Sequence, residues 1–226
     1  MMRDGGEVPA IHDVLVERLK ADARPVRRLW PPTLRLAVWV ALAVTVMATA
    51  MWGGLRPDVA DALRRPLYLV ELAAFLAAAV TAAMAALLAA VPGRARPRAG
   101  FVAVGLGAVA VVVVLSEPAP APAIPAVPGV QCALCVALFG SLPWTALFVA
   151  VRRGVPLDAG LAGIYVGGAA FLLGAAVVRI ACPVDAASHV LGWHVLPMVA
   201  WSALSAVAGA AMLPDWGCAT RSDQSS

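Results

Sequence analysis

The sequence predicts an all-α integral membrane protein, in which a short amphipathic helix precedes a bundle of six membrane-spanning helices. Of the 226 residues, 62% are hydrophobic and 13% are charged, with a mean hydropathy of +0.87. Soluble domains are about half apolar and about a quarter charged. Six segments approach the roughly 20 apolar residues that a spanning helix needs, and none alternates as strands do. This composition excludes a soluble globule, a disordered tail and a basic nucleic-acid-binding domain.

The predicted spans follow one another with short connections. They cover residues 36–53, 67–91, 101–115, 132–151, 159–178 and 190–213. The third span is the shortest and reaches spanning length when residues 99–100 are added. A segment in lipid must satisfy its backbone polar groups internally, which favours helices. We expect three parts, a segment over 1–33, a six-helix domain over 34–213 and a tail over 214–226.

The basic residues predict which ends of the spans face the cytoplasm. With the N-terminus inside, thirteen of the 17 lysines and arginines fall on the inner side and four on the outer side. Cytoplasmic loops carry the excess of basic residues in membrane proteins, so both termini are expected in the cytoplasm. Arg64 and Arg65 are exceptions on the outer side, and we expect their long side chains to extend to the lipid headgroups.

Residues 1–33 form the longest segment outside the spans, and part of this segment has the periodicity of an amphipathic helix. Its apolar residues recur at i, i+4 and i+8, namely Ile11, Leu15 and Leu19. Pro25 is expected to end the helix, and Arg27 and Arg28 belong to a basic link to the first span. The helix either lies on the membrane surface or docks a soluble partner. Its mixed acidic and basic polar face argues against pure lipid binding.

Three cysteines fall at the outer ends of the spans, and a fourth, Cys218, lies in the tail. Cys132 and Cys135 form a C-x-x-C pair at the start of the fourth span, and Cys182 follows the fifth. Because Cys132 is closer to the loop than Cys135, the expected bridge joins Cys132 to Cys182 in an oxidising outer compartment. A stabilising bridge, packed thiols and a redox- or metal-responsive pair all stay open, since C-x-x-C also occurs by chance on apolar helices.

His189, Trp193 and His194 lie at the start of the sixth span, shortly after Cys182. Cysteine and histidine ligate soft and borderline metals, but the spacing of these residues matches no familiar zinc pattern. On one α-helix, two histidines five residues apart are expected to diverge. We therefore expect no metal site here, and interfacial hydrogen bonding of the histidines with Trp193 instead.

Glu71 and Arg179 are the ionisable residues near the outer membrane boundary that need an explanation. An acid there is costly unless it is paired or in contact with water. Either Glu71 pairs with Arg179, or each side chain reaches interfacial water independently. No Ser-His-Asp set, phosphate-binding loop or pair of carboxylates is visible, so neither an enzyme nor a cofactor is expected. Gly163 and Gly167 permit close helix contact.

Several motifs, in their order along the chain, resemble those of one family. They are RPVRRLWPP at 24–32, VPG at 91–93, Cys132 followed by SLP at 141–143, RRGVPL at 152–157, CPVD at 182–185 and HVLGWH at 189–194. In these motifs the chain is similar to the six-span negative regulators of sigma F, the NrsF-type anti-sigma factors. The resemblance implies a bacterial inner-membrane protein whose cytoplasmic N-terminal segment holds an extracytoplasmic-function sigma factor inactive.

The resemblance also implies two periplasmic cysteines needed for the response to stress, and Cys132 and Cys182 match them, with Cys135 as an additional cysteine. The expected function is sequestration of the sigma factor at the membrane and its release by an external signal. The expected partners are the sigma factor and the bilayer, without direct contact to nucleic acid. The expected sigma-factor-binding residues are Ile11, Leu15, Leu19, Arg27 and Arg28. The alternatives are a membrane thiol-disulfide oxidoreductase and a small transporter that depends on Glu71.

Overall fold

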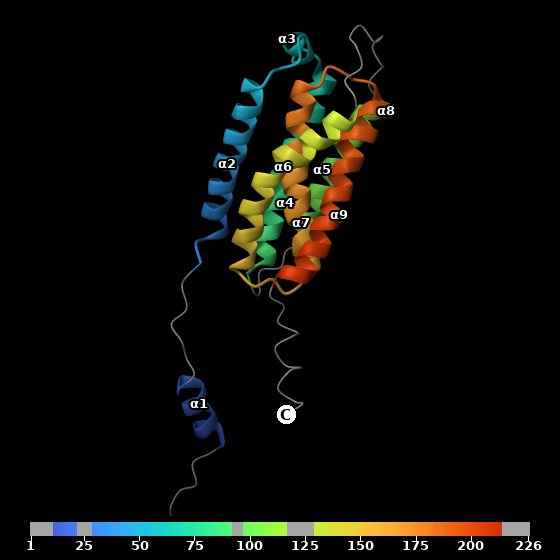
Figure 1. Cartoon of the computed structure of the whole chain (residues 1–226). Coiled ribbons are helices and arrows are strands. Elements are labelled where there is room, and N and C mark those ends of the chain that lie inside the picture. The colour runs from blue at the N-terminus through green and yellow to red at the C-terminus, as the bar shows by residue number, and fades with distance from the viewer. Residues whose placement is uncertain (1–10, 22–28, 92–96, 117–128, 214–226) are drawn as a thin grey trace, which may run out of the picture.

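The computed structural model of the protein describes residues 11–21, 29–91, 97–116 and 129–213, and the regular elements in these ranges are helices, without a strand. This confirms the all-α fold class that the sequence predicts. Within the described ranges, six helices are long and apolar enough to cross a membrane. These six pack side by side as an elongated bundle, and the first helix of the chain lies apart from them (Figure 1).

The helices follow the predicted spans closely. The N-terminal helix is α1 (Ile11–Ala21). The spanning helices are α2 (Pro32–Trp52), α4 (Pro66–Ala89), α5 (Pro97–Ser116), α6 (Gly129–Arg152), α7 (Ala159–Ala181) and a composite of α8 (Ala187–Val190), η1 (Leu191–Val195) and α9 (Leu196–Met212), while α3 (Val59–Ala62) joins α2 to α4. Prolines stand in the first turns of α2 and α4. A proline fits there because the first turn has no partner for its missing amide proton.

The helix α7 forms the centre of the bundle. It packs against α4, α6 and α9, and 78% of the residues in its apolar window are buried, against 28% for α2 and 28% for α5. In Figure 1, α2 lies at the edge of the bundle. Because α2 has few buried residues, its position depends on a small number of contacts with its neighbours.

Glycines allow α7 to approach its neighbours closely. A Cβ added at Gly163 would lie 2.3 Å from the backbone oxygen of Ser205 in α9, and one at Gly174 would lie 2.5 Å from the backbone oxygen of Val136 in α6. Small residues at such crossings are typical of helices that pack in lipid. The predicted close contact at Gly163 is therefore confirmed. Val136 also belongs to a buried cluster that contains Cys132 and Cys182.

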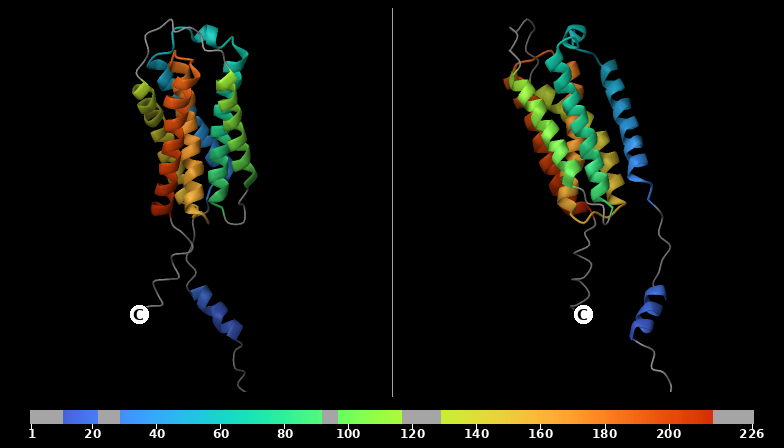
Figure 2. Two further views of the ribbon diagram at one scale, coloured as in Figure 1. Left: turned by 90° about the vertical axis from the view of Figure 1, so that its right-hand side faces the viewer. Right: turned by 180° about the vertical axis from the view of Figure 1, so that it is seen from behind.

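The two ends of the bundle differ in what they carry. We call the end with α3, the segment 182–186 and α8 the cysteine end, and the opposite end, where α2 begins and α9 finishes, the α1 end. The two further views in Figure 2 show the same separation of the ends. Polar and ionisable side chains gather at the cysteine end, which therefore carries the candidate site.

Candidate functional site

Two cysteines come together at the cysteine end. Cys132 lies in the first turn of α6 and Cys182 directly follows α7, and their buried sulfur atoms are 3.7 Å apart. The expected proximity of these two residues is therefore observed. Both are free thiols, so the expected disulfide is not formed in this structure. Cys135 lies three residues further along α6, is only partly buried and does not join this pair.

The two histidines lie beside these thiols, which corrects the expectation that they diverge. The Nε2 atom of His189 is 3.5 Å from the sulfur of Cys182, and the ring centroids of His189 and His194 are 5.4 Å apart. The physical reason is that η1 is a single π turn. In a π turn hydrogen bonds join residues five apart, so residues 189 and 194 share a face, whereas an α-helix would separate them by about 140°.

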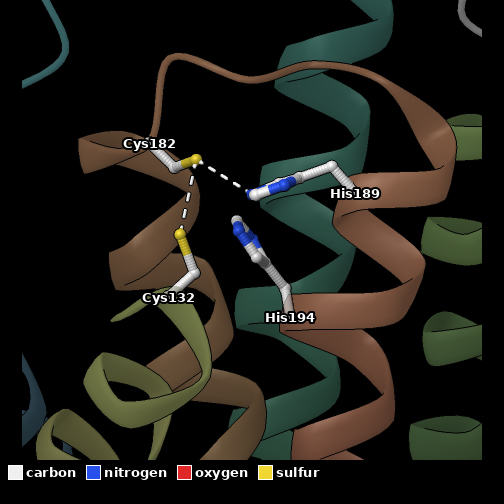
Figure 3. Close-up of side chains that lie close together, drawn as sticks. All are labelled: Cys132, Cys182, His189 and His194. Atoms are coloured by element: carbon white, nitrogen blue, oxygen red, sulfur yellow. Dashed lines mark hydrogen bonds between the residues drawn. The ribbon is translucent and has the colours of Figure 1, made fainter. Parts of the chain in front are cut away.

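Together these four residues form a compact group that we call the Cys-His cluster. One ligand atom from each of Cys132, Cys182, His189 and His194 can be chosen so that all four lie within 4.8 Å of one another. Figure 3 shows the four side chains pointing toward a common centre from α6, from the end of α7 and from the α8–η1 segment. Trp193 does not belong to this group. Its ring lies against Gly129 at the start of α6, not beside the histidines as expected.

The electrostatics of the cluster favour a thiolate at one position. The Cys132 thiol donates a hydrogen bond to the sulfur of Cys182, which lowers the pKa of Cys182, although burial acts in the opposite direction. His194 is 1% exposed. Among the described residues no side chain meets the geometry of a hydrogen bond to its ring nitrogens, although its proximity to Cys182 also acts to lower the pKa of that thiol. A buried polar atom without a partner costs free energy. The cluster therefore combines a thiolate-prone sulfur with an unsatisfied imidazole.

A second buried polar group lies next to the Cys-His cluster. Arg179 donates two hydrogen bonds to Glu71, of 2.8 Å and 3.2 Å, in a two-point contact between α7 and α4. The structure thus contains the Glu71–Arg179 pair, the first of the two arrangements considered from the sequence. Arg179 also donates a hydrogen bond of 2.6 Å to Asp185 in the segment after α7. All three side chains are buried.

Asp185 connects this pair to two further arginines. Arg56, between α2 and α3, donates hydrogen bonds of 2.7 Å and 2.9 Å to Asp185, and Arg65 donates one of 2.7 Å. Burial acts to raise the pKa of Asp185, but the hydrogen bonds from Arg56 and the charge of Arg179 outweigh it and lower that pKa. Arg56 also binds Asp58. Arg65, expected at the headgroups, thus also reaches Asp185 with a side chain that is 36% exposed, whereas Arg64 is exposed and pairs with Asp61.

We call these six side chains the ion network. Its members are Arg56, Asp58, Arg65, Glu71, Arg179 and Asp185. Three positive and three negative charges balance within it. Tyr68 lies at its centre, because its hydroxyl donates to the backbone oxygen of Arg179 and all three guanidinium groups lie within 5.6 Å of its ring centroid. Such cation–π contacts add to the ion pairs.

Sequence reasoning missed several of these residues. Arg56, Tyr68 and Asp185 were not among the expected site residues, and His189 and His194 were set aside. One signal did point to Asp185, since it ends the CPVD motif that carries the family resemblance. A second signal was the near balance of acids and arginines in the connection between α2 and α4, which suits mutual pairing.

The predicted partner-binding residues lie away from this site. Leu15 and Leu19 are on α1, and their side chains are 54% and 63% exposed. Ile11 is the first residue of α1, but the position of its side chain is outside what the structure describes. Arg27 and Arg28 lie outside the described residues. The exposed leucines thus leave an apolar face of α1 uncovered.

Comparison with known proteins gives one match. The family model described as NrsF, negative regulator of sigma F, matches residues 19–215. This range contains the whole bundle, the Cys-His cluster and the ion network. Neither a curated protein nor a solved structure matches the chain.

Proposed function

Because the chain belongs to the family of negative regulators of sigma F, we propose that it is a membrane-bound anti-sigma factor of the bacterial inner membrane. Its N-terminal segment binds a sigma factor of the extracytoplasmic-function class and keeps it from transcription. A change in the state of Cys132 and Cys182, at the opposite end of the bundle, releases the sigma factor. The role is regulatory, and no chemical reaction is assigned to the cysteines.

The distribution of charge supports an orientation with the α1 end in the cytoplasm. Most of the basic residues flank the spans at that end, as the positive-inside rule requires. Of the four basic residues at the cysteine end, three are engaged in the ion network, namely Arg56, Arg65 and Arg179. They are neutralised by carboxylates, so they weigh little against this orientation. The Cys-His cluster then faces the periplasm, where an external signal arrives.

The observation that carries the proposal is the uncovered apolar face of α1. A helix that binds in a groove presents apolar anchors at i, i+4 and i+7 or i+8, and Leu15 and Leu19 are two such anchors with most of their surface exposed. The opposite face carries charges of both signs, including a Glu17–Lys20 pair at 2.9 Å. A surface helix that binds lipid is enriched in Lys and Arg there, so a protein partner fits better.

A route for the signal runs along α6. At the cysteine end α6 carries Cys132, and towards the α1 end it holds α2 through two hydrogen bonds. Arg35 donates to the backbone oxygen of Ala150, and Trp39 donates to the backbone oxygen of Pro143 at 3.0 Å. Most of α2 is unburied, so few other contacts hold it in place. A displacement of α6 therefore moves α2 and the segment before it through these two hydrogen bonds. Signalling also requires that the two arrangements of the bundle bind the sigma factor with different free energies.

The docking helix is tested with matched aspartate substitutions on its two faces. Leu15→Asp places a charge among the apolar anchors, whereas Lys20→Asp places one about 140° away on the polar face. Each variant is co-expressed with each extracytoplasmic-function sigma factor of the source genome in turn, and co-purification and a sigma-dependent reporter are measured. Leu15→Asp should abolish co-purification and make the reporter constitutive, because burying an unpaired charge costs several kcal/mol. Lys20→Asp should still bind. Full repression by Leu15→Asp contradicts the docking helix.

The cysteine input is tested in the same reporter strain. Cys132→Ser and Cys182→Ser should each alter the response to an external inducer while the protein stays in the membrane. Cys135→Ser is the control, because Cys135 is outside the Cys-His cluster, and it should respond like the wild type. An unchanged response in both Cys132→Ser and Cys182→Ser assigns these residues to packing alone.

A further inference from the structure

The Cys-His cluster has the dimensions of a four-coordinate metal site. Zinc bonds of about 2.3 Å to sulfur and about 2.0 Å to nitrogen place two sulfurs of a tetrahedral site about 3.8 Å apart, and a sulfur and a nitrogen about 3.6 Å apart. The structure has 3.7 Å between the two sulfurs and 3.5 Å between the sulfur of Cys182 and Nε2 of His189. The nitrogen of His194 completes a group whose members all lie within 4.8 Å. Two thiols and two imidazoles are also a common ligand set for structural zinc.

We propose that Cys132, Cys182, His189 and His194 bind one divalent thiophilic metal ion, of the Zn²⁺ class, through one sulfur or ring nitrogen each. The site itself rests on this geometry, and only its use as the input for sigma-factor release rests on the proposed function. Both cysteines bind as thiolates, so the proton that the Cys132 thiol shares with the sulfur of Cys182 leaves when an ion enters.

The charges at this end of the bundle select a divalent ion. The neighbouring ion network is balanced by itself, with three arginines and three carboxylates. Two thiolates would add two negative charges in a buried place, and the two positive charges of a divalent cation cancel them. A monovalent ion would leave one buried negative charge without compensation, which is costly. Carboxylate-binding ions such as Mg²⁺ and Ca²⁺ are excluded by the sulfur ligands.

The deeply buried imidazole of His194 favours a cluster built for a ligand over chance packing. His194 is almost completely buried, and among the described residues its ring nitrogens have no hydrogen-bond partner. A metal bond satisfies one of these nitrogens. The π turn that places His194 beside His189 is a local departure from α-helical geometry, and such turns are frequently found at functional sites.

The ligands come from three segments of the bundle, so one ion would link them. Cys132 is on α6, Cys182 is at the end of α7, and the histidines are on the α8–η1 segment. Loss or exchange of the ion removes this link between the start of α6 and the end of α7. Because α6 also holds α2, this change reaches the α1 end. Binding or loss of the metal ion is therefore the signal.

The test uses the purified full-length protein in detergent, with Zn²⁺ for affinity and Co²⁺ as a spectroscopic probe. One ion should bind per chain, and the Co²⁺ form should show thiolate-to-metal charge-transfer bands and the intense visible bands of tetrahedral coordination. Cys132→Ser and His194→Gln should each weaken Zn²⁺ binding at least a hundredfold, measured by competition with a chelating dye. The control Cys135→Ser should keep the affinity of the wild type.

Three results would overturn the proposal. They are a Co²⁺ spectrum without charge-transfer bands, equal affinities of Cys132→Ser and Cys135→Ser, and a wild-type affinity in His194→Gln. If His194→Gln does not fold, His189→Ala takes its place, since the His189 side chain is partly exposed and its loss leaves no large cavity. It should bind Zn²⁺ at least tenfold more weakly, and wild-type affinity in it contradicts the site.

The metal site and the proposed function fail in distinguishable ways. Metal binding is measured without a sigma factor, and co-purification of the sigma factor is measured with Leu15→Asp and Lys20→Asp. If the chain binds Zn²⁺ but no sigma factor, the site stands and the anti-sigma function fails. If the sigma factor binds but Zn²⁺ does not, the function stands and this inference fails. If both bind, adding Zn²⁺ or a chelator to the complex should change the amount of bound sigma factor at least tenfold. An unchanged amount would show that the metal does not act as the signal.

Discussion

Two buried polar groups lie side by side at the cysteine end, and they differ in whether their polar atoms have partners. In the ion network each charge faces an opposite charge, and Asp185 alone accepts hydrogen bonds from three arginines. In the Cys-His cluster, His194 is buried as deeply as Arg179, yet among the described residues its nitrogens have no partner. The two groups even share the segment 182–186, which begins with Cys182 and contains Asp185.

Of the two groups, the ion network is complete without a ligand and the Cys-His cluster is not. A fully paired network holds its parts rigidly, and removing one member leaves the others uncompensated. A cluster with an unpaired member is stabilised when a ligand binds to that member. The ion network therefore acts as the frame of this end of the bundle, and the Cys-His cluster as the part that changes state. Each substitution below should affect one group and spare the other.

The largest effect is expected for Asp185→Ala. It removes the carboxylate that three arginines share, and it leaves Arg56 and Arg179 buried with one acid each. Breaking a buried ion pair from one side costs about 3 kcal/mol or more, so the free energy of unfolding in detergent should fall by this amount. Asp58→Ala is the control, because the Asp58 side chain is 42% exposed, and it should cost much less. Equal losses in the two variants would show that Asp185 is not the centre of the network.

A smaller effect is expected at Glu71, and it depends on the replacement. Glu71→Gln keeps a hydrogen-bond acceptor for Arg179, whereas Glu71→Leu leaves a buried guanidinium without one of its partners. An unsatisfied buried group costs about 1–3 kcal/mol, so Glu71→Leu should unfold more easily than Glu71→Gln by about that difference. Equal unfolding free energies for the wild type and both variants would mean that the two-point contact contributes nothing to stability.

In the Cys-His cluster a substitution should not lower the free energy of unfolding, in contrast to the substitutions in the ion network. In the presence of a chelator, His194→Phe replaces an unsatisfied imidazole with an apolar ring of similar size. Apolar replacement of a buried polar group is often neutral or stabilising, so the free energy of unfolding should stay the same or rise by about 1 kcal/mol. Added Zn²⁺ should stabilise the wild type and leave the variant unchanged. A loss of more than about 2 kcal/mol in the chelator would mean that His194 is already satisfied in the metal-free protein.

The smallest effect is expected for Arg64→Ala. Arg64 pairs with Asp61, and both side chains are more than three-quarters exposed. Exposed ion pairs contribute little because water and salt screen them. The melting temperature should not change measurably, in contrast to a matched Arg56→Ala variant, whose guanidinium is 1% exposed. A large loss for Arg64→Ala would extend the ion network to the surface.

The spans were predictable because hydropathy over a window depends on local sequence alone. The predicted span 132–151 and α6 (Gly129–Arg152) differ by at most three residues at either end. The proximity of Cys132 and Cys182 was predictable for a related reason, since consecutive antiparallel spans bring such positions to the same end. The Glu71–Arg179 pair was one of two open possibilities, because the rotation of each helix about its axis is set by packing and not by composition.

The rest of the site depends on features that no local sequence pattern indicates. The prediction that His189 and His194 diverge assumed α-helical geometry, and the π turn removes that assumption. The hydrogen bonds between Arg56 and Asp185 join residues 129 positions apart, which requires the relative register of two connections. The periodicity of the apolar residues predicted α1, but the sequence of one chain does not show which partner covers Leu15 and Leu19.

The π turn of η1 has a consequence for how such a site tolerates insertions and deletions in evolution. Deleting one residue within it, such as Gly192, whose Cβ position faces open space, would restore a regular α-helix. The two histidines would then be four residues apart, about 40° from one another around the helix, while the span would shorten by only about 1.5 Å. A single in-frame codon loss would thus leave both imidazoles on one face of a chain that still crosses the membrane. The reverse insertion would keep them there only with a π turn, because an α-helix would separate them by about 140°.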